Sequence, residues 1–215
     1  MKTFAAAVCV VALAGAAQAS IVQVEWRGSV EFNSVTSQPL AGATVGSAVV
    51  MSFQVDSNVF ENSASFPTRG YTIIQPSFSF TAGSASLTMQ NPFPAGTTPL
   101  FVIRDNDPAV DGFFVADNVD FPTGLPLNVN GSFGAYRNNS LATYEGTTLS
   151  SLNILDAVGT YEYTGLTNFN WTIDDGPINR VGIVFEQLSI SIVPAPASLA
   201  VLVPVLAIAR RRRRA

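Results

Sequence analysis

The feature that most constrains the fold is an alternation of apolar and hydrophilic residues that recurs along the chain. From Val22 to Phe32 every second residue is apolar or glycine, and the residues between them are hydrophilic. Because residues two apart lie on the same face of a β-strand, this pattern predicts a strand buried on one side. The same alternation marks residues 49–55, 78–80, 85–89, 169–173 and 181–192.

The last of these segments changes phase. Its apolar residues occupy odd positions up to Phe185 and even positions from Leu188 onward. One additional residue near Glu186 and Gln187 would produce this shift, so the sequence predicts a β-bulge there.

Clusters of Gly, Pro, Asn and Asp separate the predicted strands, for example at residues 67–70 and 174–177. No part of residues 20–192 shows sustained helical spacing. We therefore expect an all-β domain over residues 20–192, built as an antiparallel β-sandwich of the jelly-roll-like or immunoglobulin-like kind. We also expect the first and last strands to lie close together.

The middle of the chain is acidic and lacks several catalytic residue types. All 15 acidic residues lie between Glu25 and Glu186, whereas only five of the 11 basic residues lie there, which argues against nucleic-acid binding. The chain has no His, its single Cys is Cys9, and its single Lys is Lys2. Catalysis that depends on His, Cys or Lys is therefore excluded from the domain, and we predict that the protein is not an enzyme. A secreted hydrolase with a pair of carboxylates is the catalytic alternative.

One acidic loop has two interpretations. Asp105, Asn106, Asp107 and Asp111 follow one another closely, and their carboxylate and amide oxygens are ligands that Ca2+ prefers. The same residue types also favour a tight turn, because Asp and Asn side chains cap turns and tolerate unusual backbone angles. The loop is thus either a Ca2+ site, with Ca2+ as the one cofactor candidate, or an Asx-rich turn.

Aromatic residues raise the alternative of a secreted carbohydrate-binding module, which would need exposed, coplanar rings. Trp26 and Trp171 both alternate on faces rich in Val, Ile and Phe, so we expect them in the core.

The N-terminus has the features of a secretory signal peptide, residues 1–19. Lys2 supplies a positive charge, an apolar stretch follows, and Ala17 and Ala19 form an A-x-A cleavage site for signal peptidase. Cleavage there would make Ser20 the first residue of the mature protein and would remove Cys9.

The C-terminus, residues 193–215, combines three elements. A proline motif at Val193, Pro194, Ala195, Pro196 and Ala197 is followed by an apolar stretch, and the chain closes with Arg210, Arg211, Arg212, Arg213 and Arg214. The apolar stretch predicts a short transmembrane helix, and the arginines would hold its end in the cytoplasm.

This three-part tail, together with the signal peptide, resembles the PEP-CTERM sorting signal of Gram-negative bacteria, with Ala195 where the usual motif has Glu. The resemblance implies processing by an exosortase near the proline motif and a transient anchor in the inner membrane. It further implies export to the cell surface or extracellular matrix, where exopolysaccharide is a possible partner. We therefore expect an exported protein with a structural or adhesive body.

Overall fold

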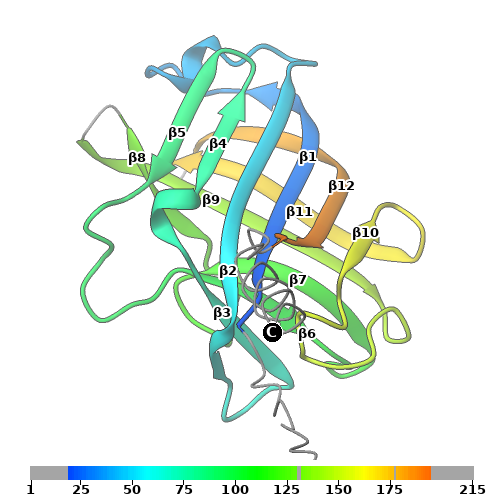
Figure 1. The fold of residues 1–215 in the computed structure, drawn as a ribbon. Helices are drawn as coiled ribbons and strands as arrows, with labels where there is room; N and C mark the ends of the chain where they lie inside the picture. The colour runs from blue at the N-terminus through cyan, green and yellow to red at the C-terminus, as the bar shows by residue number, and fades with distance from the viewer. Residues whose placement is uncertain (1–18, 130–131, 177, 195–215) are drawn as a thin grey trace, which may run out of the picture.

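The computed structural model describes residues 19–129, 132–176 and 178–194. This part is almost entirely β-structure (Figure 1). Its strands are β1 (Ile21–Asn33), β2 (Ala48–Asn62), β3 (Thr68–Ile73), β4 (Ser79–Ala82), β5 (Ala85–Met89), β6 (Leu100–Arg104), β7 (Val110–Ala116), β8 (Leu125–Val129), β9 (Ser132–Glu145), β10 (Gly159–Tyr161), β11 (Leu166–Asp175) and β12 (Asn179–Ile192). Two short 3-10 helices accompany them, η1 (Leu40–Gly42) and η2 (Gln75–Ser77).

Within these residues, no helix has the length and hydrophobicity needed to cross a bilayer. The predicted transmembrane helix and nearly all of the predicted signal peptide lie outside the described residues.

The strands form a closed antiparallel barrel, so the prediction of a jelly-roll-like or immunoglobulin-like sandwich is wrong. Eight strands follow one another in the order β1, β12, β11, β9, β7, β6, β3 and β2, and β2 pairs with β1 to complete the ring. A sandwich consists of two sheets with free edges, whereas β1 here has a hydrogen-bonded partner on each side. Closing the ring pairs backbone groups that would otherwise lie at exposed sheet edges.

The barrel wall divides into two branches between β2 and β9. The first half of β2 pairs with β4 and its second half with β3. Similarly, β9 pairs with β8 near its start and with β7 further along. One branch therefore consists of β3, β6 and β7, and the other of β4, β5 and β8. The chain passes from the first branch to the second through η2.

The pairing of β1 with β12 confirms the predicted bulge and the predicted closeness of the first and last strands. Arg27 lies opposite Gln187, but the next residue, Gly28, lies opposite Phe185. Glu186 is therefore the additional residue, and it shifts the inward face of β12 by one position.

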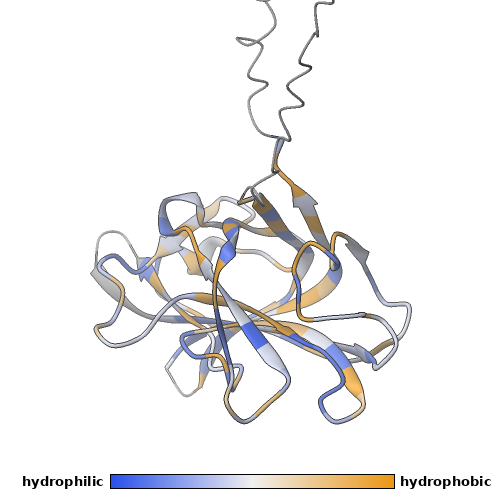
Figure 2. Ribbon diagram, turned by 60° about the horizontal axis from the view of Figure 1, so that its bottom comes forward, coloured by the Kyte–Doolittle hydropathy of each residue, from blue (hydrophilic) through white to orange (hydrophobic). Residues whose placement is uncertain are grey.

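Large aromatic side chains fill the barrel. Trp26 and Trp171 are buried, as expected, and their ring centroids lie 5.8 Å apart in an edge-to-face arrangement. Other fully buried rings of this core are Phe53, Tyr71, Phe80, Phe101, Phe113, Tyr144 and Phe185. Hydrophobic and hydrophilic residues follow one another along the strands in Figure 2, as the sequence pattern requires.

Loops close both ends of the barrel. After β1, the side-chain amide of Asn33 donates hydrogen bonds to the carbonyls of Leu40 and Ala43, which fixes a loop whose apolar side chains enter the core. Near the opposite end, the hydroxyl of Tyr71 accepts a hydrogen bond of 2.9 Å from the backbone N–H of Ile154, whose side chain is fully buried. The barrel interior is therefore a packed core and not an open channel.

Candidate functional site

The acidic loop forms a turn, and its buried carboxylate, that of Asp111, accepts hydrogen bonds from backbone N–H groups. Asp105, Asn106 and Asp107 lie between β6 and β7, and Asp111 lies in β7, fully buried. One carboxylate oxygen of Asp111 accepts the backbone N–H of Asn106 at 2.9 Å, and the other accepts the backbone N–H of Leu149 at 2.6 Å. Asp111 therefore joins this turn to the loop that closes one end of the barrel.

The other predicted Ca2+ ligands are engaged separately. The Asp105 carboxylate accepts a hydrogen bond from the side-chain amide of Asn106, and Asp107 lies 3.8 Å from the guanidinium of Arg104. Nowhere in the described residues do three or more His, Cys, Asp or Glu side chains come together as a metal site. The hydrogen bonds among Asp105, Asn106 and Asp111 give the loop the geometry of an Asx-rich turn, which is one of its two predicted interpretations. The backbone of Asn106 has a positive φ of 56°, as such a turn requires.

A second apolar cluster, which the sequence pattern did not indicate, lies on the outer face of β6 and β7. Leu100, Val102, Phe114 and Ala116 point outward from these strands and are fully buried as a separate apolar cluster. The loop after β7 contributes Val119 to this cluster, and the hydroxyl of Thr68 donates to the Val119 carbonyl at 2.9 Å.

An ion pair fixes the two ends of that covering loop. The guanidinium of Arg137 lies 2.5 Å from the carboxylate of Asp117 and also donates to the carbonyls of Thr123 and Gly124. Burial alone would raise the pKa of Asp117. Hydrogen bonds from Thr123, Arg137 and Asn118 and the charge of Arg137 outweigh burial, and they hold this pKa below its ordinary value.

Ala19 and Pro194, the described residues nearest to the two predicted processing points, lie at the same end of the barrel. The backbone N–H of Val193 donates to the carbonyl of Ile21 at 2.8 Å, so the chain enters and leaves the barrel side by side. Ala19 and Pro194 flank this contact. The other residues of the predicted processing signals lie outside the described residues: Ala17, Ala195, Pro196, Ala197 and Arg210 to Arg214.

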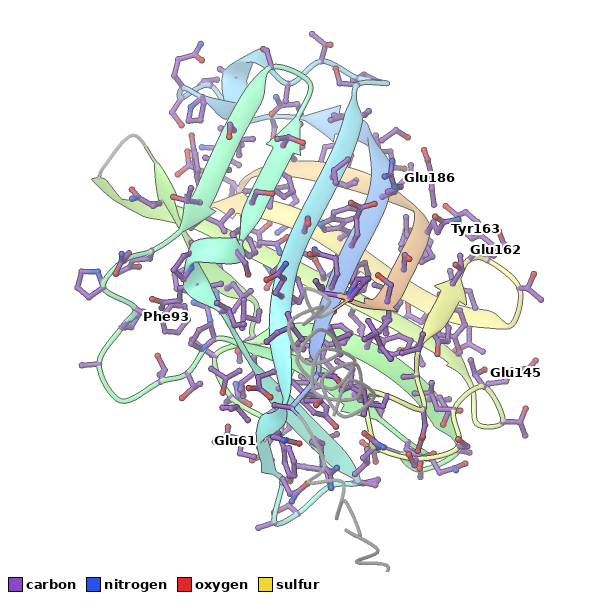
Figure 3. All side chains as sticks on the ribbon, viewed as in Figure 1. Glu61, Phe93, Glu145, Glu162, Tyr163 and Glu186 are labelled. Atoms are coloured by element: carbon purple, nitrogen blue, oxygen red, sulfur yellow. The ribbon has the colours of Figure 1, made fainter. Side chains whose placement is uncertain are left out.

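One pair of exposed aromatic rings, Tyr163 and Phe169, does not form a flat platform. Tyr163 and Phe169 are both exposed, but their rings are nearly perpendicular, at 87°, with centroids 6.3 Å apart. Tyr163 lies near Glu162 and Glu186, close to β10 and β12 (Figure 3). Partial burial raises its pKa, and the charges of Glu186 and Glu31 raise it further. This pair therefore does not provide the coplanar rings that a flat carbohydrate-binding surface needs.

No protein-family model, curated protein or solved structure matches this chain. What the protein does has to be inferred from its own residues.

A cavity of about 300 Å³ lies where η2 meets the end of β5 and β8. Its apolar lining consists of Pro76, Phe78 and Met89, and its polar lining of Gln75, Thr88, Asn91 and Asn128. The polar residues come from separate parts of the chain, so no local sequence motif predicts this cavity.

Proposed function

We propose that this chain is an exported protein of the bacterial cell surface or extracellular matrix, sorted through its C-terminal signal, with a non-enzymatic body. The body is a closed β-barrel with a structural or adhesive role. The sequence basis is the combination of an A-x-A site, a proline motif, an apolar stretch and a terminal arginine cluster.

The observation that carries this proposal is the contact between the two ends of the barrel chain. Val193 hydrogen-bonds to Ile21, so the neighbouring residues Ala19 and Pro194 lie at the same end of the barrel, which supports processing at both points. A membrane anchor attached there would leave the opposite end of the barrel, with the loop between β1 and β2, directed away from the membrane.

The pairing of strands also makes the body tolerant of processing. Every described strand lies between Ile21 and Ile192, and β1 and β12 are paired along almost their whole length. Cleavage after Ala19 and near Pro194 therefore removes no strand, so the mature body would retain the complete barrel.

The experiment replaces all five arginines from Arg210 to Arg214 with serine in the native host. The wild-type protein should be recovered from the surface or medium in a shortened form. The variant should keep its uncut tail, because the stop signal that presents the proline motif to the exosortase has been removed. Arg27→Ser, which changes an exposed arginine of the body, is the matched control and should be processed normally. Normal shortening of the five-serine variant would refute the proposal.

A further inference from the structure

The cavity between η2, β5 and β8 has the chemistry of a binding site for an uncharged, hydroxyl-rich ligand. Three of its side chains, Gln75, Asn91 and Asn128, carry amides, and Thr88 carries a hydroxyl. Amides and hydroxyls both donate and accept hydrogen bonds, as sugar hydroxyls do. None of the lining residues is charged, so the cavity offers no partner for a phosphate, a carboxylate or a cation.

The polar groups of the cavity have unused hydrogen-bonding capacity. The Oδ1 atom of Asn128 is buried and has no hydrogen-bond partner within the described part of the chain. This atom has almost no accessible surface, so a ligand in the cavity would pair with it only after the Asn128 side chain turns toward the cavity. Other buried polar atoms without a partner among the described residues include the indole nitrogen of Trp26 and the hydroxyl of Tyr144, whereas the Asn138 side chain accepts from the indole of Trp171 at 3.2 Å.

The apolar lining of the cavity offers a small contact area for C–H groups of a sugar ring. Phe78 and Met89 line the cavity while remaining almost completely buried, so they offer only a small apolar surface. The ring of Phe78 is supported from behind by Phe53, in a stacked arrangement with centroids 6.1 Å apart.

The cavity is held in place by neighbouring hydrogen bonds. The hydroxyl of Ser77 accepts the backbone N–H of Gln54 and donates to the carbonyl of Ile74, which ties η2 to β2. On the other side, Thr88 and Asn128 lie directly opposite one another on β5 and β8. The polar lining residues therefore lie on paired strands and on a turn that is hydrogen-bonded to β2. Residues that are already held in position lose less conformational entropy when a ligand binds.

We propose that this cavity binds a short segment of a neutral saccharide. Its volume is at the lower end of the range for small-molecule pockets, which suits one or two sugar units better than a long chain. The proposal goes beyond the sorting function and does not depend on it, because a protein delivered by any route could bind through this cavity.

The test titrates the full-length chain with maltotriose, cellotriose and the trimer of N-acetylglucosamine, using calorimetry and saturation-transfer NMR. Trigalacturonate serves as a charged comparison. At least one neutral trisaccharide should bind, and trigalacturonate should bind more weakly than that sugar.

Two variants locate the binding site. Thr88→Trp places a large ring at the cavity from an exposed position and should abolish binding. Asn128→Leu removes the unpaired amide at nearly constant size and should weaken binding about tenfold while leaving the fold intact. Asn168→Leu, an exposed asparagine on β11, is the matched control and should bind as the wild type does.

Three results would overturn the proposal: no neutral trisaccharide binds, trigalacturonate binds at least as tightly as any of them, or both cavity variants bind with wild-type affinity. None of these results would affect the processing of the five-serine variant, so the two proposals fail independently.

Discussion

The role of Asp111 leads to a sharp prediction about stability. Its fully buried carboxylate accepts backbone N–H groups from Asn106 and Leu149, at 2.9 and 2.6 Å. The substitution Asp111→Asn keeps the shape but replaces one oxygen with an NH2 group, which then faces a backbone donor. One hydrogen bond is lost, the other loses its charge assistance, and the two connected loops are held less firmly.

The expected magnitude follows from the strength of hydrogen bonds to charged groups, about 1.5–3 kcal/mol each, and from the penalty for an unpaired buried donor, about 1–3 kcal/mol. We expect Asp111→Asn to lower the free energy of unfolding by about 3 kcal/mol. With a denaturant slope of about 2 kcal/mol per molar urea, the unfolding midpoint should fall by about 1.5 M.

The assay is urea unfolding followed by tryptophan fluorescence, because both tryptophans are buried in the barrel. Asp105→Asn is the matched control. It retains the oxygen that accepts from Asn106 and should shift the midpoint little. Adding Ca2+ or a chelator should leave the wild-type midpoint unchanged. An unchanged midpoint for Asp111→Asn, or a strong dependence of the wild type on Ca2+, would refute this account of the loop.

Three further predictions concern the barrel and its covering loop. Gly28→Ala should destabilise the barrel by about 2 kcal/mol or more in urea unfolding, since the new Cβ atom would overlap the carbonyl oxygen of Val184. The folded-state pKa of Asp117 is lowered, so its ion pair with Arg137 stabilises the protein above the ordinary pKa of 3.8 and is lost as pH falls through the lower, folded-state value. Asp117→Asn should therefore reduce the loss of stability on acidification, as thermal melts between pH 2 and 6 would show. Burial, with a smaller effect of the Asp111 charge, raises the pKa of Tyr161 to about 12, so its neutral form stabilises the fold below the ordinary pKa of 10.0. This stabilisation should be lost as pH rises through about 12, and Tyr161→Phe should lack that late step in a tyrosinate absorbance titration.

Local features of the fold were predictable because they depend on neighbours in the sequence. Alternation marked β1 correctly, and the phase change in β12 correctly placed an additional residue near Glu186 and Gln187. Burial of Trp26 and Trp171 followed from the same pattern.

Closure of the barrel was not predictable from alternation, because a strand with one buried face is compatible with either an open sheet or a ring. The strands β6 and β7 were also missed. Side chains on both of their faces are buried, the inner face by the core and the outer face by the loop around Val119, so their sequences do not alternate.

Residues 67–70 were interpreted as a turn, yet β3 begins at Thr68. Gly70 lies within that strand. A glycine fits this position because a Cβ atom there would come within 2.8 Å of the Leu100 side chain. This glycine permits close packing and does not mark a turn. In the same way, the cavity between η2, β5 and β8 depends on side chains that only the folded barrel brings together.

The most direct test of the proposed function is the intact mass of the protein recovered from the envelope and medium of its native host. The account predicts that residues 1–19 are absent and that the chain ends near the motif from Pro194 to Ala197, with any added mass identifying what the body is attached to. A chain that still ends in Ala215 and is found only in the inner membrane would contradict it, because the tail would then be a permanent anchor and not a sorting signal.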